Sequence, residues 1–197
     1  MTDVSRISSA AGRSPAARPE PDGRSAYDVG DRKALRTVLG AFATGVTVVT
    51  AEGDEAPHGM TANAFTSVSL DPPLVLVCID HDAVMHRVLG TTGHFGVSVL
   101  AGEQEAVARH FADRWRVLGT AEFDTVDWRP GPLTGVPLIS DALASLECEV
   151  WRSYDGGDHT IFLGRLLSLD RRADGEVLAF FDGRFCHLDL DRSEVSA

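Results

Sequence analysis

The apolar residues of this chain recur first with the period of a helix and then with that of strands. Four apolar residues in the segment 31–42 are spaced by three and four: Leu35, Val38, Leu39 and Phe42. This spacing predicts an amphipathic helix, in which Asp31 suits the N-cap position and Gly45 the stop.

After residue 45 the pattern becomes that of β-strands. Runs that are β-branched, continuously apolar or alternating predict strands at 46–50, 73–79, 95–100, 146–151, 160–169, 176–181 and 185–190. Two short helices, 82–89 and 103–111, interrupt them, and Asp182-Gly183 predicts the turn of the last hairpin. Many strands with few helices favour a closed antiparallel β-barrel over a parallel doubly wound sheet.

Both ends of the chain differ in composition from its centre. Pro, Ala, Ser, Gly and Arg dominate residues 5–25, with little to bury, which predicts a disordered tail over 1–26. We expect one domain over 27–190 and a short C-terminal tail over 191–197. The first residues lack the apolar core of a secretory signal, and no run of about 18 apolar residues could form a membrane-spanning helix. A cytoplasmic protein without a membrane partner is expected.

Charge and cysteine content exclude further classes. The net charge is −11 and the chain has one lysine, Lys33, so a nucleic-acid partner is not expected. Cys78, Cys148 and Cys186 lie far apart and form no CxxC pair, which favours reduced thiols. The seven histidines show no HExxH or paired metal spacing, so no metal site is predicted.

The common nucleotide and hydrolase motifs are absent, but one stretch has an unusual composition. No GxGxxG, GxxxxGK[ST] or GxSxG sequence occurs. The segment 59–73 combines small residues, hydroxyls and the amide of Asn63 ahead of an apolar strand. Small side chains would let a flat ligand approach the backbone, while Asn63 and Thr66 or Ser67 offer polar contacts. Composition alone favours the alternative, a turn-rich connecting loop.

A second stretch, 155–160, lies between two predicted strands. Gly156 and Gly157 suit a hairpin turn with positive φ, and His159 enters the next strand beside an acid. His159 is either a donor that faces a ligand or a half-buried strand residue. The residues by themselves thus define a cytosolic β-barrel domain whose ligand is open.

Taken in order, seven segments resemble the flavin reductase family that supplies two-component flavin-dependent monooxygenases. They are 42–50, 59–70, 72–78, 95–100, 109–112, 146–148 and 157–159. Each motif is short, but their common order is specific, and the resemblance covers roughly residues 31–188. The Ala-, Arg- and Gly-rich, Lys-poor composition is also similar to actinobacterial reductases of natural-product pathways.

The resemblance implies a fold and an activity. It implies a split β-barrel, a homodimer with FMN or FAD at its interface, and transfer of a hydride from NADH, or NADPH, to the flavin. The reduced flavin would then diffuse to a partner monooxygenase. Two alternatives remain: a flavin-binding carrier or sensor without turnover, and a split-barrel oxidase with another cofactor, as in pyridoxamine-phosphate oxidases or deazaflavin enzymes.

The resemblance also assigns candidate residues. It implies that the flavin ring lies on Gly59, Met60, Thr61, Ala62, Asn63 and Ala64, with Ser67 close by, and that Phe111 is near the flavin. Cys78, Ile79 and Asp80 would lie beside the ribityl and phosphate portion, and the helix start at Ala83, Val84 and Met85 would bind the phosphate. His159, the candidate catalytic residue, would face the nicotinamide together with Asp158. Many members have a Ser or Thr pair where this chain has Ala83 and Met85. The Asp-Ala-Val-Met sequence of this chain resembles a subgroup that uses FAD, which favours FAD over FMN.

Overall fold

The computed structural model describes residues 26–188, in two parts that meet after Phe42. The first part contains α1 (Arg32–Leu39), and Asp31 is its N-cap as predicted, because its carboxylate accepts hydrogen bonds from the N–H groups of Lys33 and Ala34. The predicted stop at Gly45 is wrong. The helix ends at the C-cap Gly40, and Gly45 instead pairs with Ala179 in a β-ladder. Apart from Ala26, the predicted tails at 1–26 and 191–197 lie outside the described residues.

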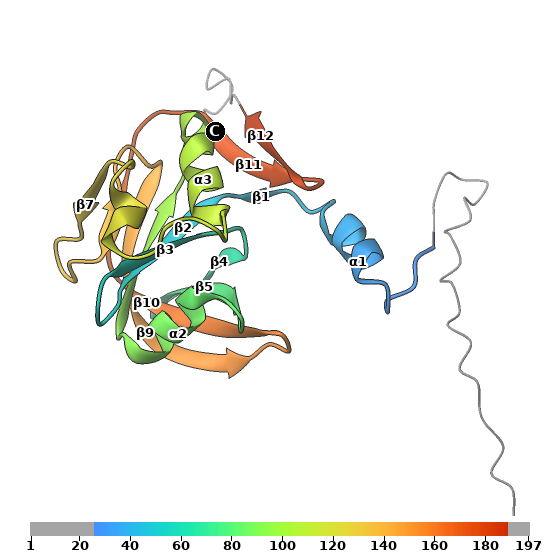
Figure 1. The fold of residues 1–197 in the computed structure, drawn as a ribbon, viewed down its shortest axis with the longest axis horizontal. Helices are drawn as coiled ribbons and strands as arrows, with labels where there is room; N and C mark the ends of the chain where they lie inside the picture. The colour runs from blue at the N-terminus through green and yellow to red at the C-terminus, as the bar shows by residue number, and fades with distance from the viewer. Residues whose placement is uncertain (1–25, 189–197) are drawn as a thin grey trace, which may run out of the picture. The chain divides into compact units, whose positions relative to one another are not determined.

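The second part is built on one antiparallel sheet of seven strands, in the order β3-β2-β6-β9-β10-β5-β4 (Figure 1). Along the chain these strands are β2 (Thr47–Glu52), β3 (Pro57–Ala62), β4 (Phe65–Leu70), β5 (Pro73–Asp80), β6 (His94–Val99), β9 (Ala144–Asp155) and β10 (His159–Arg171). The predicted antiparallel β-architecture is confirmed. Strands β9 and β10 extend well beyond their predicted ranges.

Smaller elements complete this part. A three-stranded sheet joins β1 (Thr44–Gly45), β11 (Val177–Phe181) and β12 (Arg184–Leu188), and a two-stranded sheet joins β7 (Trp128–Pro130) and β8 (Pro137–Ile139). The helices are α2 (Val84–Thr91) and α3 (Glu105–Ala112), with 3₁₀ turns at Gly102–Gln104 and Thr120–Phe123. The predicted hairpin around Asp182-Gly183 is confirmed, with positive φ at both residues.

The segment 59–70, expected as a loop, is mostly two strands. Residues up to Ala62 belong to β3 and those from Phe65 to β4, so only Asn63 and Ala64 connect them. These strands are the first and last of the seven-stranded sheet. Two connecting residues hold the α-carbons of Ala62 and Phe65 at most about 11 Å apart. The sheet therefore curls until its two edges meet at this corner, without a ladder between them.

Two apolar clusters pack against opposite faces of the seven-stranded sheet. One includes Val49, Ile79, Met85 and Phe95, and the other includes Leu100, Phe111 and Leu178. Successive residues of a strand point to opposite faces, so Val48 and Val49 of β2 belong to different clusters.

Two acids, Glu122 and Glu147, are buried among the described residues. Glu147 on β9 is fully buried. Its carboxylate accepts hydrogen bonds from the N–H of Leu133 and from the N–H and the hydroxyl of Thr134, and each of the two bonds from Thr134 is 2.7 Å long. Ser168 on β10 donates a further hydrogen bond. Burial raises the pKa of Glu147, but these donors outweigh it and hold the pKa below the usual 4.5. The carboxylate thus anchors the 133–134 turn to the sheet.

Candidate functional site

Three segments that are distant in sequence line a cavity of about 340 Å³ at one side of β3. Strand β3 contributes His58, Met60 and Thr61; the end of β5 and the start of α2 contribute Asp80, Asp82, Ala83 and Val84; α3 and the residues after it contribute Phe111, Ala112, Arg114, Arg116 and Leu118. The volume is in the range of small-molecule sites.

The start of α2 gives this cavity an anion-binding end. The first N–H groups of a helix, here at Val84 and Met85, have no intrahelical partner, and the N-cap Ala83 has no polar side chain to bond to them. The turn before it is ordered by Asp80, whose carboxylate accepts a hydrogen bond from the N–H of Asp82 at 2.9 Å. Free amides and the helix dipole make this end suitable for a phosphate group. Arg114, an exposed side chain, supplies a positive charge to the same cavity.

A close approach between Gly59 and Phe111 shapes the inner wall. A Cβ atom at Gly59 would lie 2.5 Å from Cε1 of the Phe111 ring, which is fully buried. Phe111 also packs against Phe123, with ring centroids 5.3 Å apart. Only glycine therefore lets α3 pack so closely on β3.

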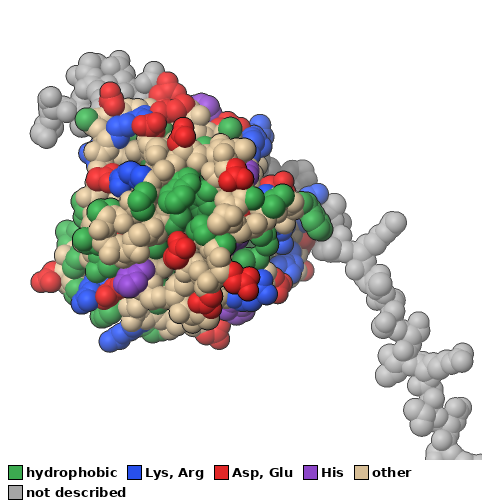
Figure 2. All heavy atoms as spheres, turned by 60° about the vertical axis from the view of Figure 1, so that its left-hand side comes forward, with side chains coloured by type: hydrophobic (Ala, Val, Ile, Leu, Met, Phe, Trp, Pro, Cys, Tyr) green, Lys and Arg blue, Asp and Glu red, His purple; other side chains and the backbone are tan. Residues whose placement is uncertain are grey.

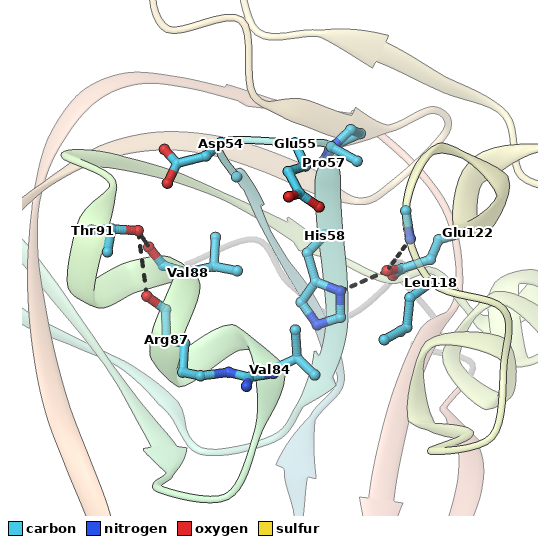
Figure 3. Close-up of a pocket in the computed structure, with 13 residues that line it drawn as sticks. Asp54, Glu55, Pro57, His58, Val84, Arg87, Val88, Thr91, Leu118 and Glu122 are labelled. Atoms are coloured by element: carbon cyan, nitrogen blue, oxygen red, sulfur yellow. Dashed lines mark hydrogen bonds and ion pairs between the residues drawn. The ribbon is translucent and has the colours of Figure 1, made fainter.

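A buried charged cluster lies behind the wall and consists of His58, Arg116 and Glu122. Nδ1 of His58 lies 2.7 Å from Oε1 of Glu122, and the Arg116 guanidinium lies 3.2 Å from Oε2 (Figure 3 shows the first contact). All three side chains are at most 8% exposed. Burial raises the pKa of Glu122, but the hydrogen bond from His58 and the nearby charges hold it below its usual value. Glu122 is therefore an anion that fixes the other two side chains.

This cluster also closes the free edge of β3. The N–H of Gly59 donates to Glu122 at 3.2 Å, and the guanidinium of Arg116 donates to the C=O of Gly59. The two side chains thus supply the acceptor and donor that a neighbouring strand would give. Nearby, the hydroxyl of Thr61 donates to the C=O of Ala108 on α3 at 2.7 Å. The cavity wall is held by side chains from outside the sheet.

The structure brings some of the predicted site residues together and not others. Six line the cavity: Met60, Thr61, Asp80, Ala83, Val84 and Phe111. Asn63, Ala64 and Ser67 are exposed at and beyond the corner between β3 and β4, while Gly59, Ala62, Ile79 and Met85 are buried. Cys78 is half-buried, and burial raises the pKa of its thiol. Its N–H donates to the C=O of Ala64 at 3.0 Å, which ties β5 to the corner.

His159 lies near this cavity without lining it. It is the first residue of β10, and its Nδ1 lies 2.7 Å from the Asp158 carboxylate, with 39% of its side chain exposed. Of the two glycines expected to have positive φ in the preceding turn, only Gly157 does, at 86°. Asp158 therefore orients an accessible imidazole.

Several cavity residues were not singled out from the sequence. His58 directly precedes the segment 59–70, and Arg114 and Arg116 closely follow the segment 109–112, so their places in the chain could have indicated them. Glu122 has no such signal, because its partners are contributed by β3 and by the segment after α3.

The described residues offer neither a metal-binding cluster nor a membrane-spanning helix. Within residues 26–188, no group of three or more His, Cys, Asp or Glu side chains could hold a metal ion. None of the helices described in that range is long and apolar enough to cross a membrane.

These features define a class of protein: an antiparallel barrel whose cavity combines residues of an edge strand, free helix amides and arginines. This donor set fits a flat nucleotide with a phosphate group. Residues 39–189 match the family model described as flavin reductase like domain, and the chain belongs to that family. The predicted family, the split-barrel fold and the enzyme class are confirmed.

Similar proteins agree with this assignment. The chain is 54% identical over 170 residues to an NADH-dependent FAD reductase of Streptomyces globisporus, covering 86% of this chain and 93% of the relative. It is 48% identical over 159 residues to an NADH-dependent flavin reductase of a Rhodococcus species, covering 79% and 86%.

Solved structures of such proteins have the same fold. The NADH:FAD oxidoreductase of Streptomyces globisporus, solved with NAD and FAD fragments, is 53% identical with a TM-score of 0.78, covering 84% of this chain and 97% of that one. The flavin reductase component of a bacterial two-component tryptophan halogenase is 53% identical with a TM-score of 0.77, covering 80% and 98%.

Proposed function

We propose that this chain is an NADH-dependent flavin reductase that acts on FAD, or on FMN, and releases reduced flavin to a partner monooxygenase. The names of its relatives support this reading, since they include an FAD reductase and the reductase component of a two-component halogenase. NADPH is the alternative hydride donor.

The observation that carries the proposal is the cavity between β3 and the start of α2. Met60 and Thr61 of β3 form one side, and Ala83 and Val84 at the start of α2 form the other. A flavin ring would lie along the backbone of β3, and its phosphate would meet the amides of α2. The predicted ring contacts at Asn63, Ala64 and Ser67 continue this surface around the corner of the sheet.

The chemistry supplied by a bound flavin is the acceptance of a hydride from the reduced nicotinamide, which requires no protein nucleophile. The residues of this chain bind and align the two rings. Backbone N–H groups of the 61–64 segment would stabilise negative charge on the ring. His159, held by Asp158, would position the nicotinamide at the open side of the cavity.

The same proposal includes a homodimer in the cytoplasm. Large apolar side chains are exposed beside the candidate site, among them Trp115 at 94% and Val117 at 72%. Such side chains favour a protein–protein contact. Figure 2 shows one face on which acidic groups are spread and basic groups lie scattered among them, so this face offers no basic patch for nucleic acid.

Steady-state rates with all four pairings of NADH or NADPH with FAD or FMN test the proposal. We expect flavin-dependent oxidation of NADH, read from its absorbance. Flavin binding without NADH oxidation would support the carrier or sensor instead. If the protein neither binds a flavin nor oxidises NADH, the split-barrel oxidase with another cofactor is favoured instead.

A further inference from the structure

The side chain of His86 joins the start of α2 to the start of β10. His86 is the third residue of the helix, and its Nε2 lies 2.8 Å from the hydroxyl oxygen of Thr160 in a part-buried contact. The same imidazole packs edge-on against the ring of Phe162, with ring centroids 5.9 Å apart. One polar and one aromatic contact thus connect the first turn of the helix to two residues of the strand.

Both ends of this connection lie beside groups of the candidate site. The backbone N–H of His86 donates to the C=O of Ala83 at 3.1 Å, so His86 belongs to the same turn as Ala83 and Val84, which line the cavity. On the strand, Thr160 directly follows His159, the residue assigned to the nicotinamide. A displacement at either end would therefore move residues of the proposed flavin and nicotinamide sites.

The contact adds direction to the packing of α2. Met85 and Leu89 bury the inner side of the helix in one of the two apolar clusters, and the N-cap Ala83 makes no side-chain hydrogen bond to the helix. Apolar burial is non-directional and tolerates small shifts of a helix, whereas a hydrogen bond restricts both a distance and an angle. The bond to Thr160 therefore fixes the helix start against the strand.

The chemistry of the contact suits positioning. A hydroxyl group both donates and accepts hydrogen bonds, so Thr160 can bond to Nε2 of His86 whichever ring nitrogen carries the proton. The link therefore does not depend on the tautomer of the imidazole. Positioning matters for this reaction because a misplacement of about 1 Å between two reacting rings can slow the transfer by as much as about 100-fold.

We propose that His86 is a positioning residue for hydride transfer, which through Thr160 holds the phosphate-binding start of α2 in a fixed place relative to His159. The inference rests on the proposed function, because it takes the start of α2 as the phosphate site and His159 as the contact of the nicotinamide. His86 does not line the cavity, so it acts on the reaction through these two groups.

Removal of either partner tests the link. His86→Leu and Thr160→Val each delete the hydrogen bond, and His86→Gln can restore it through its amide group. Thr92→Val is the matched control, because it deletes a threonine hydrogen bond of 3.0 Å to the C=O of Val88 at the other end of the same helix. Thr160→Val, which keeps the shape of the side chain, preserves the test if His86→Leu does not fold.

Three quantities are measured for each variant. Stopped-flow reduction at saturating NADH gives the rate of hydride transfer. Flavin fluorescence gives the dissociation constants of FMN and of riboflavin, which lacks the phosphate, and requires no turnover. Melting temperatures report the stability of the fold.

We expect His86→Leu and Thr160→Val each to slow flavin reduction about threefold to tenfold, the range for one lost hydrogen bond. Each should also weaken the binding of FMN more than that of riboflavin. The double variant should be no slower than the slower single variant, because both substitutions remove the same bond. His86→Gln should recover most of the rate, and Thr92→Val should keep the original rate.

Three outcomes would overturn the assignment. They are multiplied losses in the double variant, an equal slowing by Thr92→Val, and a lower melting temperature with an unchanged rate and an unchanged ratio of FMN to riboflavin affinity. The last would leave a contact that serves stability alone. An original protein that reduces flavin while its variants show one of these outcomes refutes only this inference; an original protein that neither binds flavin nor oxidises NADH refutes the proposed function.

Discussion

His159, the first residue of β10, is the register partner of Asp80, the last residue of β5. The N–H of His81 donates to the C=O of Asp158 at 3.1 Å, so the tip of the β9–β10 hairpin is tied to the strand end that lines the cavity. The imidazole is therefore fixed at the rim of the candidate flavin site, although its ring does not line it.

From this arrangement we expect His159→Ala to slow flavin reduction roughly tenfold in kcat/KM for NADH, because one oriented contact to the nicotinamide is lost. The flavin dissociation constant should change less than about twofold, since the ring is outside the cavity. Stopped-flow reduction measures the first quantity and fluorescence titration the second. Asp158→Asn keeps the imidazole and should give a smaller loss. An unchanged rate together with an unchanged apparent NADH affinity would refute the role of His159.

Replacement of Gly59 by alanine tests the close packing on Phe111. The new Cβ would overlap a fully buried ring, so Gly59→Ala should lower the free energy of unfolding by about 1–3 kcal/mol. Gly90→Ala on α2 is the control: nothing lies within 4 Å of its added Cβ, and it should stabilise the protein by up to about 1 kcal/mol. Urea unfolding measures both changes. A Gly59→Ala protein as stable as the original would contradict the described contact.

The buried Glu147 predicts a dependence of stability on pH. Since its pKa is lower in the folded protein than the usual 4.5, its contribution is complete above that value and is lost as pH falls through the lower, folded-state pKa. Glu147→Gln should cost about 2 kcal/mol or more at neutral pH, because the amide turns a donor toward donors. Its stability should also fall less steeply in acid. The half-buried neighbour Glu149, paired with Arg165, is the control, and a similar cost for Glu149→Gln would argue against a special role for Glu147.

The cysteines should differ in reactivity. Cys148 is fully buried, and burial together with the charge of Glu147 raises its pKa to about 12. The thiolate is the reactive form, so an alkylating reagent at neutral pH should leave Cys148 unmodified in the folded protein. Peptide mass spectrometry should find modification at this residue only after denaturation, and sooner at the half-buried Cys186. Rapid alkylation of native Cys148 would contradict its burial.

The proposed homodimer is tested by light scattering of the full chain. We expect a mass twice the 21.1 kDa of one chain. Trp115→Asp, at a fully exposed apolar position, should weaken association if this side chain lies in the contact. A single-chain mass at all concentrations rules the homodimer out.

Local sequence patterns predicted most strands of the seven-stranded sheet. β-Branched runs, continuous apolar runs and alternation located the core of β2, β5, β6, β9 and β10, because these strands bury one or both of their faces. The helix stop at Gly45 failed because a glycine also suits a short strand, and the chain had already left the helix at Gly40. The segment 59–70 was misjudged as a loop since its small and hydroxyl residues are poor strand indicators, although pairing with β2 and β5 makes them strands.

Only those site residues that lie within one sequence motif could be predicted. Residues within one motif, such as Met60 and Thr61, could be assigned from the resemblance and do line the cavity. The cluster of His58, Arg116 and Glu122 depends on contacts between residues up to 64 positions apart, which no local pattern encodes. Long-range partners of this kind require the tertiary structure.

The closure of β3 by Arg116 and Glu122 has a consequence for solubility. A bare edge strand presents donors and acceptors that can recruit a strand from another molecule and start aggregation. At Gly59 the carboxylate and the guanidinium already occupy those groups. The two side chains that shape the cavity therefore also protect the barrel from intermolecular β-pairing at that point.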